Sequence, residues 1–116
     1  MTGEPVAAFV EGLRRLQTDP EVRDGLLVYR VEPVEGAHAG ELVETAVEVI
    51  ELAGWPMTPP HWIHLPARVA LPATNSQPST RSGWLRHSRQ VRGWGGDADP
   101  ERAWVAHVRG VLGAAR

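Results

Sequence analysis

The tetrapeptide Arg86-His87-Ser88-Arg89 places a histidine next to a serine, between two arginines. An imidazole can accept the proton of a hydroxyl group, so His87 and Ser88 could act as base and nucleophile in acyl transfer or hydrolysis. Side chains adjacent in sequence usually point apart, and catalytic triads are assembled from distant segments. We therefore favour a surface arginine cluster in which Ser88 bonds to the backbone, and the enzymatic interpretation stays open as an alternative.

Positive charge is concentrated around this tetrapeptide. The formal net charge of the chain is −2, and yet residues 81–92 contain five basic side chains: Arg81, Arg86, His87, Arg89 and Arg92. Arginine pairs with carboxylates and phosphates through two parallel hydrogen bonds, so this cluster could bind an anionic group. A small anion-binding domain is therefore a further alternative.

The chain contains no cysteine, which excludes thiolate nucleophiles, disulfides and cysteine–zinc sites. Conventional thioester-forming activity is excluded with them, because that chemistry needs a thiolate. The net charge gives no electrostatic drive toward nucleic acid or a membrane surface, so neither is expected as a partner. No apolar run approaches the roughly 20 residues of a membrane-spanning helix, and the N-terminus lacks a basic signal region, so a cytoplasmic protein is expected.

Histidines and tryptophans are the other side chains with binding potential. His61 and His64 stand three residues apart in a predicted strand, where they would face opposite sides of a sheet, so no metal site is expected. No cofactor is expected either. The five tryptophans all lie beyond residue 54: Trp55, Trp62, Trp84, Trp94 and Trp104. We expect most of them in the core, although Trp84 and Trp94 lie close to arginines and could stack on them.

Helices are expected near both ends of a chain whose 116 residues suit one domain. Apolar residues recur at helical spacing over residues 5–17 and again over residues 101–112. Asp99 is a suitable N-cap for the second helix, because Pro100 follows it at the first helical position.

Strands and loops are expected between these helices. β-branched and aromatic residues predict strands over residues 26–32 and 61–65. Residues 41–52 fit a helical stripe and also the alternation of a strand, and the strand is slightly favoured. Residues 66–83 contain three prolines and many small polar residues, which predicts a long loop.

A proline motif and a basic segment carry a resemblance to a known family. Residues 55–60 read Trp-Pro-Met-Thr-Pro-Pro, which resembles the Tyr-Pro-x-x-Pro-Pro motif of the ubiquitin-conjugating (E2, or UBC) superfamily. That family then has a glycine, a catalytic cysteine three residues later and a tryptophan eight residues beyond. Here Gly83, Arg86 and Trp94 have this spacing, so arginine stands at the position of the nucleophile.

Residues 84–89 read Trp-Leu-Arg-His-Ser-Arg and are followed by Trp94 and two aspartates, Asp97 and Asp99. This pattern is similar to a bacterial branch of the superfamily, prokaryotic E2 family E, and the resemblance covers about residues 20–112. The asparagine that precedes the glycine in most E2 enzymes is replaced by Pro78, and Asn75 lies near that position but out of register.

The resemblance implies an α+β, UBC-like domain over residues 1–116: an N-terminal helix, a four-strand antiparallel meander, a long loop and a C-terminal helix. It favours a strand at residues 41–52, because the proline motif follows a strand in the family. Without a cysteine, it implies a non-catalytic binding or scaffold module in a bacterial ubiquitin-like pathway. Its implied partners are a ubiquitin-like protein, an E1-like adenylating enzyme and a JAB-type peptidase. The binding residues would come from the basic segment and its neighbours: Asn75, Trp84, Arg86, His87, Arg89, Arg92 and Trp94.

Overall fold

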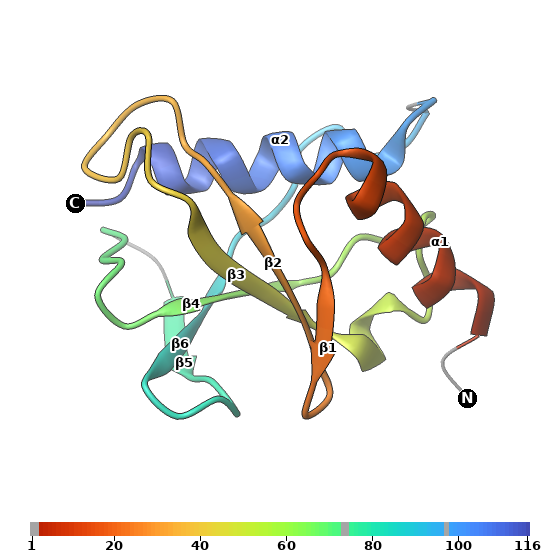
Figure 1. The fold of residues 1–116 in the computed structure, drawn as a ribbon, viewed down its shortest axis with the longest axis horizontal. Helices are drawn as coiled ribbons and strands as arrows, with labels where there is room; N and C mark the ends of the chain where they lie inside the picture. Colours follow the sequence, from red (N-terminus) through yellow and green to blue (C-terminus); the bar gives the residue numbers. More distant parts are fainter. Residues whose placement is uncertain (1–2, 73–74, 97) are drawn as a thin grey trace.

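The computed structural model describes residues 3–72, 75–96 and 98–116. Its strands form an antiparallel, six-stranded sheet in the order β1-β2-β3-β4-β6-β5, and two α-helices pack on it, so the described residues have an α+β structure (Figure 1). The elements are α1 (Gly3–Arg15), β1 (Glu21–Arg23), β2 (Leu26–Val31), β3 (Val43–Glu48), the 3-10 helix η1 (Val49–Leu52), β4 (Trp62–Pro66), β5 (Asn75–Pro78), β6 (Trp84–Ser88) and α2 (Pro100–Gly113).

Both helices pack against the same face of the sheet. The ring of Phe9 in α1 lies 6.4 Å from the ring of Tyr29 in β2, and Trp104 Nε1 in α2 donates to Tyr29 Oη at 2.7 Å. All three side chains are fully buried. Asp99 caps α2 as expected, by accepting a hydrogen bond from the Arg102 backbone N at 3.1 Å. The two predicted helices are thus confirmed.

The strand predicted at residues 41–52 is confirmed over β3, which pairs with β2, the strand predicted at residues 26–32. Leu26 stands opposite Glu48 and Val31 opposite Val43, so β2 and β3 pair along their whole length. The prediction was wrong at its end, because residues 49–52 form η1 instead of extending the strand. Strand β2 begins at Leu26, so the chain beyond Glu48 has no partner in that strand to pair with.

The expected four strands and the loop over residues 66–83 were both wrong. Asn75–Pro78 form β5, which pairs with β6, and β6 in turn pairs with β4. The β5–β6 hairpin and β1, which pairs with β2, therefore extend the sheet to six strands. All four residues of β5 are exposed, so no alternation of apolar and polar residues marks this strand in the sequence.

Strand register divides the basic segment between the two faces of the sheet. Tyr29 faces the helices, and successive residues of a strand face opposite sides. Following the pairing from Tyr29 across β3 and β4 places His87, opposite Ile63, on the helix-covered face. The same register places Arg86, opposite His64, and Ser88 on the open face. Basic side chains that are neighbours in the sequence are therefore separated by the sheet.

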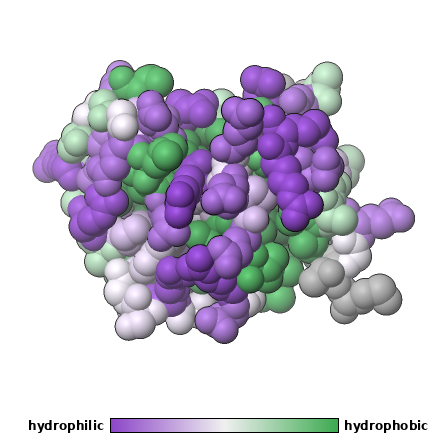
Figure 2. Space-filling view, in the orientation of Figure 1, coloured by the Kyte–Doolittle hydropathy of each residue, from purple (hydrophilic) through white to green (hydrophobic). Residues whose placement is uncertain are grey.

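The outer surface is largely hydrophilic on the side seen in Figure 2, with hydrophobic atoms showing between the polar groups. Isolated large apolar side chains are nevertheless exposed, among them Ile50 and Met57. Neither helix within the described ranges has the length and apolar character needed to cross a membrane.

Candidate functional site

The proline motif and the basic segment, which lie far apart in the sequence, meet in the structure. Trp94 Nε1 donates a hydrogen bond to the Pro56 carbonyl oxygen at 2.9 Å. The rings of Trp55 and Trp94 lie 5.3 Å apart, and Trp55 also packs edge-on against Phe9 of α1 at 4.6 Å. Trp55 is buried, so this contact fixes the segment after β6 on the hydrophobic core.

A groove lies where these two segments meet, with a volume of about 490 Å³. One wall is formed by residues 58–61, which include Pro59 and Pro60, and the other by residues 88–91 and Trp94. We call it the proline groove. Because prolines fix their own backbone torsions, the first wall is rigid and suits the binding of an extended segment.

Arg86, a predicted binding residue of the basic segment, is held by contacts within the chain. Its Nη2 donates to Gln77 Oε1 at 2.6 Å, and its Nη1 lies 3.7 Å from Glu48 Oε1. The guanidinium also lies over the ring of Trp62, 4.5 Å from the centroid. These contacts join β3, β4, β5 and β6 on the open face, so Arg86 has a structural role there.

Among the described residues, the Ser88 side chain bonds to His61 and not to the backbone or to His87. Its Oγ lies 2.9 Å from His61 Nε2, across the mouth of the proline groove. His87 points the other way and is buried on the helix-covered face. The predicted base of the enzymatic alternative was therefore wrong, because alternation along β6 separates the two neighbours and brings His61 to Ser88 instead.

His64 forms a buried polar contact on the open face of the sheet, which the sequence did not predict. His64 is fully buried, and its Nδ1 lies 2.7 Å from Ser79 Oγ in the β5–β6 turn. The same Ser79 Oγ accepts a hydrogen bond from the Arg81 backbone N, so Ser79 joins the hairpin turn to His64. Burial, assisted by the charges of Arg86 and His87, lowers the pKa of His64 to about 4. A neutral imidazole with such a low pKa is a poor general base and fixes the hairpin to β4.

The remaining predicted binding residues are spread around these features. Trp84 is buried, with Arg81 stacked over its ring at 4.7 Å. Asn75 is exposed and pairs with Ser88 across the β5–β6 ladder, which places it beside the basic segment. Arg89 approaches α2, where its charge and, more strongly, burial lower the pKa of His107. Arg92 is exposed in the loop after β6.

Among the described residues, Asp99 forms no salt bridge to the basic segment that precedes it. Asp99 caps α2 and lies 3.4 Å from Arg102 Nε, and Asp97 lies outside the described residues. Among residues 3–72, 75–96 and 98–116, no group of three or more histidine, aspartate or glutamate side chains could hold a metal ion. His61 and His64 instead bond to separate serines, Ser88 and Ser79.

The chain was compared with families, curated proteins and solved structures. No family model, curated protein or solved structure matches it.

Proposed function

We propose that this chain is a non-catalytic binding module of the UBC-like type, acting in a bacterial ubiquitin-like conjugation pathway. Its partners would be a ubiquitin-like protein, an E1-like adenylating enzyme and a JAB-type peptidase. The proline groove would hold an extended segment of one of them, such as the C-terminal tail of the ubiquitin-like protein.

The observation that supports this proposal most strongly is the contact between the two motifs that carry the family resemblance. Trp94, at the spacing of the family tryptophan, bonds to Pro56 of the proline motif. The two motifs lie far apart in the sequence, so their contact at one groove favours a relation of this chain to the UBC-like type. The order of helix, antiparallel strands, proline motif and final helix is also compatible with the UBC-like type, although the described sheet has six strands.

The chemistry available also favours binding over catalysis. The chain has no cysteine, and Arg86 is occupied by Gln77, Glu48 and Trp62. A residue so engaged cannot replace a thiolate as nucleophile.

A second candidate function is favoured by one observation, the hydrogen bond between Ser88 and His61. A serine and a histidine 2.9 Å apart beside a groove have the geometry of a nucleophile and its base. Acyl transfer to Ser88 is therefore the alternative to simple binding. Within the described ranges, however, no carboxylate lies within hydrogen-bonding distance of the His61 ring to orient it, which makes the dyad incomplete.

The groove can be tested by filling it. Ser88→Trp places a large ring at its mouth and should weaken binding of the source organism's ubiquitin-like protein by about tenfold, or about 1.4 kcal/mol. Ser82→Trp is the matched control, because Ser82 is exposed in the β5–β6 turn and does not line the groove. Isothermal titration calorimetry gives the affinities, and thermal melts verify that both variants fold. Equal affinity for folded Ser88→Trp and Ser82→Trp would argue against the groove as the binding site.

A further inference from the structure

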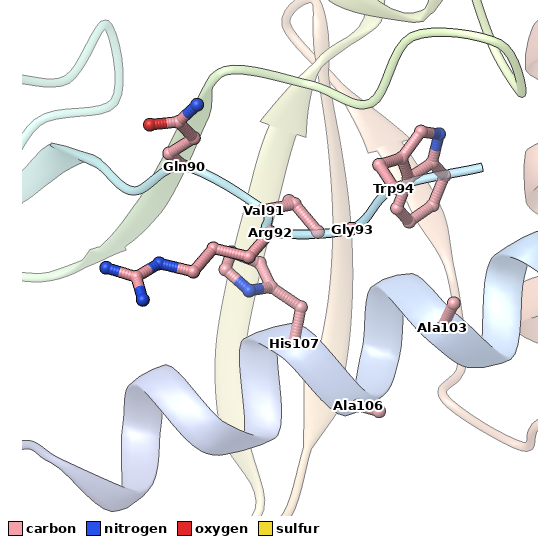
Figure 3. Close-up of a pocket in the computed structure, with 8 residues that line it drawn as sticks. All are labelled: Gln90, Val91, Arg92, Gly93, Trp94, Ala103, Ala106 and His107. Carbon is pink, nitrogen blue, oxygen red and sulfur yellow. The ribbon is translucent and has the colours of Figure 1, made fainter.

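A second cleft lies on the other side of the segment that follows β6. It runs between residues 90–94 and helix α2 and has a volume of about 480 Å³. We call it the helix cleft. Figure 3 shows His107 rising from α2 toward this segment, with the Arg92 side chain extended beside it and Trp94 farther along the cleft. Ala103 is one of the small side chains on the helix side, which leaves the cleft open.

Arg92 carries the one full positive charge among the described residues that line the helix cleft, and no negative charge matches it. None of the described residues that line the cleft is acidic. Arg92 is exposed and makes no ion pair within the described ranges. Arg89, three residues earlier, lines the proline groove, and its only hydrogen-bond acceptor among the described residues is the Pro72 carbonyl oxygen, at 3.5 Å.

Arg89 is a partly buried cation in a place where a counter-ion is expected. Its Nε is shielded from solvent and has no hydrogen-bond partner among the described residues, and the same holds for His107 Nε2. The Arg89 charge reaches both His87 and His107, because it adds to burial in lowering the pKa of each imidazole. A buried or half-buried charge is normally paired, since its desolvation is otherwise uncompensated.

We propose that the helix cleft binds the phosphate group of a small phosphorylated molecule. Arg92 would pair directly with the phosphate, the neutral His107 ring would line one side, and the nearby Arg89 would add a second positive charge. A phosphate carries up to two negative charges and accepts hydrogen bonds on three oxygens, which suits two arginine charges better than a singly charged carboxylate does. The cleft is larger than a phosphate alone, and Trp94 offers a ring against which an organic group can pack.

This site is separate from the proposed function. The two pockets share Gln90, Val91 and Trp94, but Arg92 and His107 line the helix cleft and not the proline groove. Loss of phosphate binding would therefore leave the proposal about ubiquitin-like partners standing, and the reverse also holds.

The test uses the intact chain and two probes, inorganic phosphate and phenyl phosphate, at constant ionic strength. Nitrogen-15 NMR follows the Gly93 and Ala106 amides, which line the helix cleft but not the groove, during each titration. We expect saturable shifts, with phenyl phosphate binding at least threefold more tightly than inorganic phosphate. Arg92→Ala should weaken both at least fivefold, and Arg92→Lys should weaken them less, because it keeps the charge but loses the planar fork.

Arg30→Ala is the matched control, because it removes an exposed arginine from β2, which does not line the helix cleft. Acetate is a third probe, which tests whether the cleft binds a carboxylate as well as it binds a phosphate. The proposal is overturned if no saturable shift appears, if Arg92→Ala binds as well as Arg30→Ala, or if acetate binds as tightly as inorganic phosphate. Because Arg92 is exposed and unpaired among the described residues, its replacement leaves the fold intact, and a thermal melt verifies this.

Discussion

Lowering the pH from 6.5 to 4 is expected to remove about 3 kcal/mol of the free energy of unfolding through His64 alone. His64 is fully buried, and its pKa falls from the ordinary 6.5 to about 4 in the folded chain. The main cause is burial, and the charges of Arg86 and His87 add to it. In the unfolded chain the imidazole takes up a proton near pH 6.5, so between these pH values the unfolded state binds more protons. Stability must therefore decrease as the pH falls through this window.

Urea denaturation at several pH values measures this effect. His64→Asn keeps a polar side chain near Ser79 but cannot be protonated in this range, so its stability should depend less steeply on pH than that of the parent chain. A smaller slope of the same sign should remain, because burial also lowers the pKa of His87 and His107. If the free energy of unfolding depended equally steeply on pH in the two proteins, His64 would not be held neutral by the fold.

Glu101→Ala is expected to lower the free energy of unfolding by about 2 to 4 kcal/mol. Glu101 is only 5% exposed, and its Oε2 accepts a hydrogen bond from Trp55 Nε1 at 2.8 Å. Its Oε1 lies 3.4 Å from Arg15 Nη2 of α1. Alanine would leave the buried indole N–H of Trp55 without an acceptor and would open a cavity between the helices. Gly12 belongs to the same arrangement, because a Cβ there would overlap Glu101 Cγ.

Glu101→Gln separates the contribution of the hydrogen bond to Trp55 from that of the ion pair with Arg15. The amide oxygen can still accept from Trp55, whereas the ion pair with Arg15 is lost. Because the Arg15 side chain is 56% exposed, that pair should contribute less than about 1 kcal/mol. Chemical denaturation should therefore rank the proteins with Glu101→Gln close to the parent and Glu101→Ala far below it. Similar losses for both variants would mean that the charge, and not the bond to Trp55, stabilises this region.

The strands with a buried face were predictable from the sequence, and the hairpin at the sheet edge was not. Strands β2 and β3 bury most of their residues, so β-branched side chains mark them. Strand β5, Asn-Ser-Gln-Pro, is exposed throughout and contains a proline, which is typical of an edge strand but also of a loop. Only its pairing with β6 distinguishes the two, and no local pattern encodes that pairing.

The side-chain partners at the candidate site depended on the same pairing. The sequence placed His87 beside Ser88, but the register of β4 against β6 brings His61 to Ser88 and buries His87. It also assembles Glu48, Ser79 and Arg86 around His64 from β3, β4, β6 and the hairpin turn. By contrast, the N-cap at Asp99 follows from local rules and was correctly predicted. Side-chain contacts between strands that are distant in the sequence can be predicted only when the register of the strands is known.

Binding without catalysis can be measured in one mixture. The chain is incubated with the source organism's ubiquitin-like protein, its E1-like enzyme and ATP, and is then examined by native and denaturing mass spectrometry. We expect a non-covalent complex in the native spectrum and an unmodified chain mass after denaturation. A covalent adduct at Ser88 would mean that the chain is an acyl-transfer enzyme, and the absence of any complex would argue against the proposed pathway.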